Sequence, residues 1–177
     1  MSRVLQMSWK TVAPRRAVPG MSVLDTSVTE LRVNPFDLDL LFHVNNGVYL
    51  QMADVARWDF LADLGALNRL RKRRWYPVVA AASVKFKKSL KVNQKVKITS
   101  QVLGWDSRIV YMQHIFTVGD QLYATVWIAG RFLQVGGKRI SPEEVVDLLS
   151  HGDAPESPEL PPDVLAWARA LDVAERS

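Results

Sequence analysis

The sequence predicts an α+β domain in which one long helix is wrapped by a curved antiparallel sheet. Two observations carry this prediction. Residues 45–64 place apolar side chains on more than one stripe of a helix, so other structure must cover that helix on most sides. Residues 76–135 then change to four strand-like segments joined by tight turns such as GWDSR and VGDQ, which is typical of antiparallel pairing. A sheet that covers such a helix has to curl around it.

The first strand and the helix follow in a clear order. Residues 23–33 are predicted to form a strand, which Pro35 ends. The helix begins at Asn45 or Asn46, because either side chain can cap it, and Gly65 is a suitable stop. The apolar alternation that comes next predicts an antiparallel meander of four strands at residues 76–90, 94–106, 108–118 and 121–135.

The C-terminal part is predicted to contain two more helices. Residues 141–150 form a short helix, because Ser141 can act as its N-cap and Glu144, three residues later, completes a capping box. A proline-rich linker, residues 152–162, then leads to a last amphipathic helix at about residues 163–173.

These elements divide the chain into three expected parts. Residues 1–22 form an irregular N-terminal arm, residues 23–150 form the domain, and residues 151–177 form the proline-rich linker and the C-terminal helix. A long central helix wrapped by a curved antiparallel sheet is the description of the hotdog fold. The expected fold class is therefore α+β with hotdog architecture.

The composition narrows the class of protein. The chain has 177 residues, of which 48% are hydrophobic and 23% charged, so one globular domain with a small appendage is expected. The absence of cysteine excludes disulfides and cysteine nucleophiles and fits a reducing compartment. No apolar run approaches the ~18 residues of a spanning helix, and the N-terminus lacks the apolar core of a secretory signal. We therefore expect a cytoplasmic protein without a transmembrane segment.

The net charge of +5 and the pI of about 9.6 suit a negatively charged partner. Nucleic acid is not expected, because the basic runs lack interleaved aromatic side chains. A phosphate-rich ligand such as coenzyme A fits the same sign of charge. The cations form one cluster in RLRKRRW, with Arg69, Arg71, Lys72, Arg73 and Arg74, and a second cluster with Lys85, Lys87, Lys88 and Lys91. We favour the first cluster for phosphate binding, although both could simply be solvated surface.

The segment DLDLLFHVNNGVY, residues 37–49, carries the strongest chemical signal. If the helix starts near Asn46, its first backbone N–H groups have no partner within the helix and carry the positive end of its dipole. Such donors can stabilise an oxyanion, and the Asp39 carboxylate just upstream could attack a thioester carbonyl or activate a water molecule. The alternative is a capped helix whose Asp and Asn side chains satisfy amides of the loop. Residue chemistry alone leaves both open.

The stretch DLDLLFHVNNGVYLQMADVAR resembles the start of hotdog acyl-CoA thioesterases of the 4-hydroxybenzoyl-CoA thioesterase-like family. Those proteins carry an Asp, then His-x-Asn-Asn, a Tyr three residues later, and an acid and an Arg on the helix. The matching residues here are Asp39, His43, Asn45, Asn46, Tyr49, Asp54 and Arg57. The resemblance continues through SVKFKKSLKVNQKV, VLGWDSR and RFLQVGGKRISPEEVVDLL and is closest to the branch of the thioesterase superfamily member six proteins.

The resemblance implies an acyl-CoA thioesterase. It assigns Asp39 as the catalytic nucleophile or general base, His43 as a further catalytic residue, and the backbone N–H near Asn46 as the group that polarises the thioester carbonyl. Asn45 and Tyr49 of the motif are implied to bind the substrate. Because basic residues of this family meet coenzyme A phosphates at the rim of the pocket, Arg71, Arg73 and Arg74 are implied substrate-binding residues as well. Active sites of this family form between protomers, which implies a homodimer or a homotetramer.

Two departures from the pattern keep alternatives open. Phe42 stands where many members have Gly before the His, and Leu41 stands where plant acyl-ACP thioesterases have an Asn. The alternatives are a hotdog protein that binds acyl-CoA without hydrolysing it and an acyl-ACP thioesterase. Asp54 is a reserve catalytic acid, because some hotdog enzymes place the acid on this helix, but with Arg57 it can equally form a structural ion pair.

Metal and cofactor sites are not expected. The three histidines, His43, His114 and His151, are dispersed along the chain, and without cysteine they do not make a zinc site. His114 lies on a predicted strand and is expected to be a core or interface residue. His151 lies in the linker and is expected to be solvated.

Overall fold

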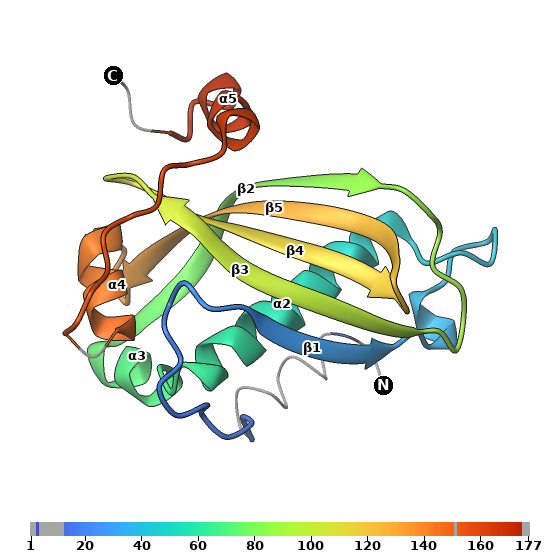
Figure 1. The fold of residues 1–177 in the computed structure, drawn as a ribbon, viewed down its shortest axis with the longest axis horizontal. Coiled ribbons are helices and arrows are strands. Elements are labelled where there is room, and N and C mark those ends of the chain that lie inside the picture. Colours follow the sequence, from blue (N-terminus) through green and yellow to red (C-terminus); the bar gives the residue numbers. More distant parts are fainter. Residues whose placement is uncertain (1–2, 4–12, 151, 175–177) are drawn as a thin grey trace.

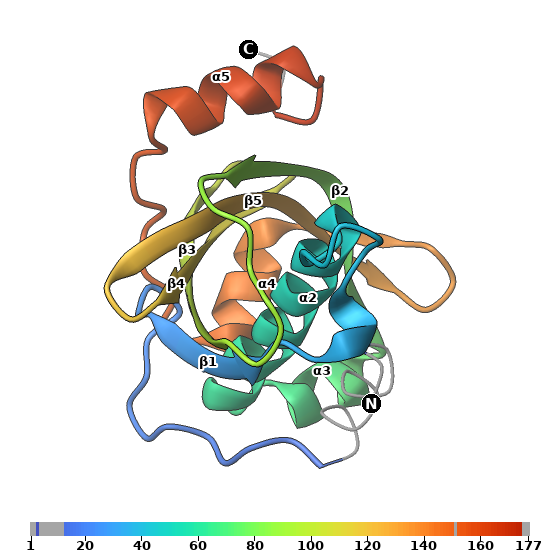
Figure 2. The ribbon, with the colours of Figure 1, turned by 90° about the vertical axis from the view of Figure 1, so that its right-hand side faces the viewer.

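The computed structural model describes residue 3, residues 13–150 and residues 152–174. In this part of the chain a six-stranded antiparallel sheet curls around α2 (Asn46–Asp63), and Figures 1 and 2 show the helix on the concave side. The sheet has the order β1 (Ser27–Arg32), β3 (Lys95–Trp105), β4 (Val110–Val118), β5 (Gln121–Gln134), β2 (Trp75–Phe86), and β6 (Arg139–Ile140) pairs with β5. The predicted hotdog architecture is confirmed.

The central helix α2 forms where the sequence predicts it. The Asn45 side chain accepts a hydrogen bond from the Gly47 N–H at 2.9 Å, so Asn45 is the N-cap. The helix ends before Gly65, whose φ of +61° is the left-handed conformation that a helix end commonly requires. Buried residues such as Met52, Ala53 and Phe60 lie on α2, and the core extends along both halves of the helix.

The expected meander is wrong for one strand. β3, β4 and β5 pair in sequence order, but β2 pairs with β5 at the far edge and not with β3. Residues 87–94 therefore cross the open end of the curled sheet, as Figure 2 shows. The crossing is held by Leu90, which is fully buried, donates its N–H to the Tyr49 hydroxyl at 3.1 Å, and accepts from the Val44 N–H at 3.0 Å. The buried Leu90 therefore anchors a crossing connection between β2 and β3 where the sequence predicted a tight turn.

Three further helical segments surround this frame. The predicted helix α4 (Pro142–Leu149) is confirmed, with a capping box between Ser141 and Glu144. The basic cluster of the sequence forms a short helix, α3 (Leu67–Arg73), which the sequence did not predict. A single turn, η1 (Pro35–Asp37), follows β1 and leads into the loop before α2.

The last helix, α5 (Pro162–Ala170), lies on the outer face of the sheet, opposite α2 (Figure 2). Its Val164 and Ala168 pack against buried residues of the sheet, including Tyr111 and Ala129. The linker before α5 crosses so close to β3 that a Cβ on Gly104 would lie 2.8 Å from the Pro158 carbonyl oxygen. Glycine is required at this crossing because any side chain would displace the linker backbone.

Residues 13–22 of the N-terminal arm have no helix or strand but are attached to α2 by charge. Arg15 forms ion pairs with Asp59, at 3.7 Å, and with Asp63 of α2, both of which are buried. Thr29 of β1 also donates to Asp59, at 2.9 Å. Residues 1–2, 4–12, 151 and 175–177 lie outside the described residues, so the expectations for the rest of the arm and for the His151 side chain remain predictions. None of the described helices has the length and apolarity needed to cross a bilayer.

Candidate active site

The loop before α2 is folded around the Asp39 carboxylate. Asp39 Oδ1 accepts hydrogen bonds from the backbone N–H groups of Leu41, at 2.8 Å, and His43, at 3.3 Å. The Asp39 N–H in turn donates to the His43 carbonyl at 2.8 Å. No described residue donates a hydrogen bond to Oδ2. One carboxylate oxygen therefore shapes the loop, while the other accepts no hydrogen bond from the described residues.

The start of α2, seven residues after Asp39, supplies a free backbone donor. Among the described residues the backbone N–H of Asn46, the first residue of the helix, has no acceptor. The preceding N–H, of Asn45, is already bound to the Asp37 carbonyl at 2.9 Å, and the following one, of Gly47, is bound to the N-cap side chain. Because the N-terminal dipole of a helix favours negative charge, the Asn46 N–H is suited to a developing oxyanion.

Phe42, just before His43, has a backbone conformation that favours glycine. Its φ is +59°, a left-handed conformation that is costly for a bulky side chain. The side chain gains no packing in return, because it is 78% exposed, and Leu40 beside it is 97% exposed. A strained, solvent-facing apolar loop at a candidate site points to a partner surface that covers it.

A buried ion pair fixes the loop from behind. The Asp37 carboxylate receives two hydrogen bonds from the Arg3 guanidinium, at 3.0 Å from Nε and 2.5 Å from Nη2, and both side chains are at most 4% exposed. Asp37 Oδ2 also accepts from the Asn34 N–H at 2.8 Å. The sequence reading noted this carboxylate but assigned it no role. Its burial shows that it holds the loop rather than meeting a substrate.

The structure gives Tyr49 a structural function. Its ring is 1% exposed and packs edge-on against Phe86, with a centroid distance of 5.0 Å, and against Phe116 at 5.6 Å. Its hydroxyl accepts the Leu90 N–H that anchors the β2–β3 crossing. Tyr49 therefore joins the helix start to the crossing segment, and contact with substrate would require this core to open. His43, Asn45 and Asn46 are placed around the helix start beside Asp39.

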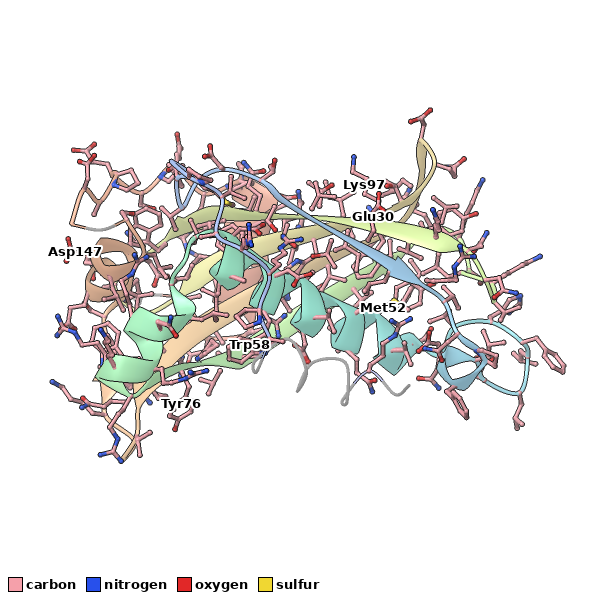
Figure 3. All side chains as sticks on the ribbon, turned by 90° about the horizontal axis from the view of Figure 1, so that it is seen from below. Glu30, Met52, Trp58, Tyr76, Lys97 and Asp147 are labelled. Carbon is pink, nitrogen blue, oxygen red and sulfur yellow. The ribbon has the colours of Figure 1, made fainter. Side chains whose placement is uncertain are left out.

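An apolar cavity of about 310 Å³ lies toward the other end of α2. It is bounded by α2, β2, the inner face of the sheet and α4, and its lining includes Trp58, Phe60, Val79, Met112 and Phe132. Figure 3 shows Trp58 on the half of α2 next to α3 and Tyr76 at the start of β2. The volume is at the lower end of the ~300–1,000 Å³ that small-molecule sites usually have. Sequence reading could not have found it, because its walls come from six separate segments.

Asp54 and Arg57 are the charged groups in the wall of this cavity. They form an ion pair within α2, with side chains 36% and 16% exposed. Burial raises the pKa of the Asp54 carboxyl, and the neighbouring Arg57 opposes that rise. Because a helix rises ~1.5 Å per residue, Asp54 lies about 12 Å along the axis from Asn46. In one chain, Asp54 therefore does not join Asp39 in a single constellation.

His114 is buried on β4 near this ion pair. Its Nδ1 lies 2.8 Å from the Ser100 hydroxyl, while its Nε2 has no hydrogen-bond partner in the described structure. Burial, and secondarily the positive charge of Arg57, lower the pKa of His114 to about 3. The imidazole is therefore neutral in the folded protein at neutral pH, as a core residue would be.

The shifted pKa of His114 predicts a loss of stability in acid. The unfolded chain takes up a proton near the ordinary pKa of about 6.5, while the folded chain does not until about pH 3. The free energy of unfolding therefore carries no penalty from His114 above pH 6.5. It falls as the pH drops from 6.5 toward 3, by up to ~1.4 kcal/mol per pH unit. Urea unfolding from pH 7 to 4 measures this slope. His114→Gln should show a shallower slope, and equal slopes in both proteins would refute this assignment.

Most of this geometry lies within one match to a known family; Arg3 lies outside it. The family model for the thioesterase-like superfamily matches residues 33–168, from the end of β1 into α5. The chain belongs to this superfamily. The match covers the Asp39 loop, the start of α2, the sheet and the cavity.

Individual members of the thioesterase-like superfamily agree with this placement. Protein THEM6 of Xenopus laevis is 29% identical over 140 residues, which span 79% of this chain and 66% of the frog protein. The long-chain acyl-CoA thioesterase FadM of Escherichia coli K12 is 24% identical over 90 residues, which span 51% of this chain and 68% of FadM. The resemblance to the member six branch is thus confirmed.

A solved structure with the same fold is the probable thioesterase YbaW from Escherichia coli. It superposes with a TM-score of 0.63 at 22% identity and covers 69% of this chain and 94% of its own. At that identity the likeness concerns the fold. It places the curled sheet and central helix of this chain in the same architecture as that of a probable thioesterase.

The three arginines expected to bind coenzyme A phosphates are exposed around the end of α3. Arg71 lines a small apolar pocket of about 220 Å³ that shares Trp58 with the larger cavity. The Arg73 guanidinium lies 5.7 Å from the centre of the Trp75 ring, and Arg74 ends the helix in the left-handed conformation. Of the three, Arg71 is therefore placed at the rim of this pocket. The described residues contain no group of carboxylates and histidines that could hold a metal ion.

Proposed function

We propose that this chain is an acyl-CoA thioesterase, which hydrolyses an acyl thioester to a free acid and coenzyme A, with Asp39 as the catalytic carboxylate. Membership of the superfamily supports thioester hydrolysis in general. The observation that carries the finer proposal is the pairing of a half-free carboxylate with a free N–H in one loop. Asp39 Oδ2 and the Asn46 N–H are both unpartnered among the described residues, while their neighbours are bound.

The proposed reaction uses these two groups in turn. Asp39 takes a proton from water as the water oxygen attacks the thioester carbonyl carbon. The negative charge that develops on the carbonyl oxygen is stabilised by the Asn46 N–H at the helix start. The C–S bond then breaks, and the proton held by Asp39 passes to the leaving thiolate. Direct attack by Asp39, with hydrolysis of the resulting anhydride, uses the same two groups. His43 supports Asp39 through the backbone hydrogen bonds of the loop.

The cavity beside α2 is the proposed site of the acyl group. Its walls are apolar apart from Asp54 and Arg57, which suits a hydrocarbon chain whose burial contributes ~0.8 kcal/mol per methylene. FadM, a relative, is named as a long-chain acyl-CoA thioesterase. We expect acyl-CoA to be the substrate of this chain as well. A cytoplasmic location stays a prediction from the sequence.

In this proposal, a homodimer brings the Asp39 loop of one protomer to the acyl cavity of the other. The Asp39 loop and the cavity lie toward opposite ends of α2, so one chain does not hold both beside one thioester. β2 is an edge strand whose outer side pairs with no described strand, and Tyr76 and Val79 on it are exposed. Antiparallel pairing of two β2 edges would bring the Asp39 loop of one protomer toward the cavity of the other. The exposed side chains of Leu40 and Phe42 would be covered by the same contact.

Thiol release from a panel of acyl-CoAs of increasing chain length tests the function. We expect turnover, a dimeric mass by light scattering, and a preference among chain lengths. Tight binding of acyl-CoA without turnover by a folded dimer would favour the acyl-CoA binding protein instead. Turnover restricted to acyl carrier protein thioesters would favour the acyl-ACP thioesterase.

Filling the mouth of the cavity should shorten the accepted acyl chain. Val79→Trp places a large side chain at the exposed edge of the cavity. Because Val79 also lies on the β2 edge that pairs in the proposed dimer, light scattering must show that the variant keeps the mass of the wild-type assembly. We expect kcat/KM for long chains to fall about fourfold for each methylene that is excluded, while short-chain substrates are unaffected. Val92→Trp, at an exposed position outside the cavity, is the matched control. An unchanged chain-length profile for Val79→Trp would place the acyl group elsewhere.

A further inference from the structure

Three arginines converge on a pocket that the proposed catalytic residues do not use. The pocket has a volume of about 230 Å³ and is lined by Arg108 in the β3–β4 turn, Arg131 of β5 and Arg139 of β6, with Ser107 and Ser141 beside them. It lies at the end of the sheet where β3 meets β4, opposite the end that carries the loop before α2 (Figure 1). The three side chains come from the β3–β4 turn and from two consecutive, paired strands, β5 and β6.

These arginines have no carboxylate counter-ion among the described residues. None of them is in an ion pair, and the only hydrogen bond from their guanidinium groups runs from Arg108 to the Ala174 carbonyl at 3.2 Å. The nearest acid, Asp106, accepts bonds from the Tyr111 hydroxyl and from backbone N–H groups of its own turn. The cluster therefore keeps an excess of positive charge.

The guanidinium groups are close enough to affect one another. The pKa of Arg131 is lowered first by burial and then by the positive charges of Arg139 and Arg108, which outnumber the opposing charge of Asp106. Like charges gathered in this way destabilise the fold unless an anion neutralises them. Ser141 on the pocket wall is also the N-cap of α4, whose dipole adds to the positive potential.

We propose that Arg108, Arg131 and Arg139 form a binding pocket for the phosphate monoester group of a nucleotide. Planar guanidinium groups match phosphate oxygens with paired hydrogen bonds, and three of them suit a dianion. Two sources carry this chemistry, the 3′-phosphate of coenzyme A and a free nucleotide. In the first case the proposal rests on the proposed function and adds the residues that hold the carrier.

The basic residues of the alternative cluster around α3 make electrostatic interactions within the protein. Arg71 and Arg73 lie in the last turn of the helix, where cations complement the dipole, and Arg73 also lies over the Trp75 ring. One pocket gathers the side chains of Arg108, Arg131 and Arg139, whereas the pocket beside α3 is lined by Arg71 alone of its cluster. The phosphate site is therefore assigned to the sheet rather than to α3.

Calorimetric titration of the full chain with coenzyme A, 3′-dephospho-coenzyme A and adenosine 3′,5′-bisphosphate tests the pocket. We expect coenzyme A to bind about tenfold or more tightly than its 3′-dephospho form, since a charge-assisted contact is lost. The difference should vanish in Arg139→Gln, an exposed position with little risk to folding, and in Arg131→Gln. Arg73→Gln is the matched control and should keep the difference.

The outcomes separate this pocket from the thioesterase proposal. Equal binding of the two coenzymes, with no binding of the bisphosphate, would overturn the pocket even if acyl-CoA is hydrolysed. Binding of the bisphosphate that Arg139→Gln abolishes would support the pocket even if no thioester is turned over. The source is decided by kinetics. A rise in KM for acyl-CoA in Arg139→Gln, but not for an acyl thioester of N-acetylcysteamine, identifies coenzyme A, and an unchanged KM identifies a free nucleotide.

Discussion

Asp39→Asn is expected to lower kcat for acyl-CoA hydrolysis by about 10²–10⁴-fold, the usual contribution of a positioned general base, and to leave the loop folded. Asparagine keeps an oxygen that can accept from the Leu41 and His43 N–H groups, so the hydrogen bonds of Oδ1 survive. What it removes is the negative charge on Oδ2. Thiol release under saturating substrate measures the loss, and thermal unfolding confirms that the variant is folded.

Two companion variants make this result specific. Asp39→Ala loses the loop hydrogen bonds as well as the charge, so it should be equally inactive and also less stable. Asp54→Asn removes the reserve acid on α2 and leaves the Asp39 loop untouched. If Asp54→Asn abolishes turnover while Asp39→Asn stays active, the catalytic carboxylate is on the helix and the assignment of Asp39 fails.

Asp37→Ala is expected to destabilise the folded chain by about 3–5 kcal/mol, because it leaves the buried Arg3 guanidinium without its carboxylate. A loss of this size is a large part of the ~5–15 kcal/mol that stabilises a typical domain. Urea unfolding at neutral pH measures it. Asp25→Ala is the control, since the Asp25 carboxylate also accepts a loop N–H, that of Ser22 at 2.7 Å, but is exposed. Its cost should be about 1 kcal/mol or less.

A double-mutant cycle separates the charge from the loop geometry. Arg3→Met combined with Asp37→Ala removes both charges, so the double variant should be more stable than the sum of the two single losses predicts. Strict additivity would mean that Asp37 acts through its bond to the Asn34 N–H alone. Because Asp37 lies two residues before Asp39, turnover in these variants should fall with the stability of the loop.

The local signals in the sequence predicted much of the fold. An N-cap at Asn45 or Asn46, Gly65 as helix stop and the Ser141–Glu144 capping box all depend on residues within one turn of each other, and all three are confirmed, with Asn45 as the cap. The partner of β2 depends instead on Leu90, which fills the open end of the sheet. In the sequence, a buried leucine in a crossing segment looks the same as a buried leucine in a strand. The sequence therefore predicted that β2 pairs with β3, whereas it pairs with β5.

The same distinction applies to the candidate site. The Asp39 loop is one continuous segment that leads into α2 at Asn46, so the sequence alone indicates that it lies before the helix start. Asp37 and Asp39 differ in burial. Two acids separated by one residue in the same motif give no sign in the sequence of which one is buried. The cavity beside α2 and the three-arginine pocket are assembled across the sheet, so no local pattern signals either of them.

The docking of α5 limits how this protein can assemble. The outer face of the sheet is occupied by a segment of the same chain, and the linker reaches it through the close crossing at Gly104. A tethered segment competes at an effective concentration of roughly millimolar for a short linker, far above that of another protein molecule in solution. A second copy would have to displace α5 before two sheets could stack back to back. Any tetramer built from a β2-paired dimer must therefore use a different surface. In this way the C-terminal segment restricts which quaternary structures the protein can form.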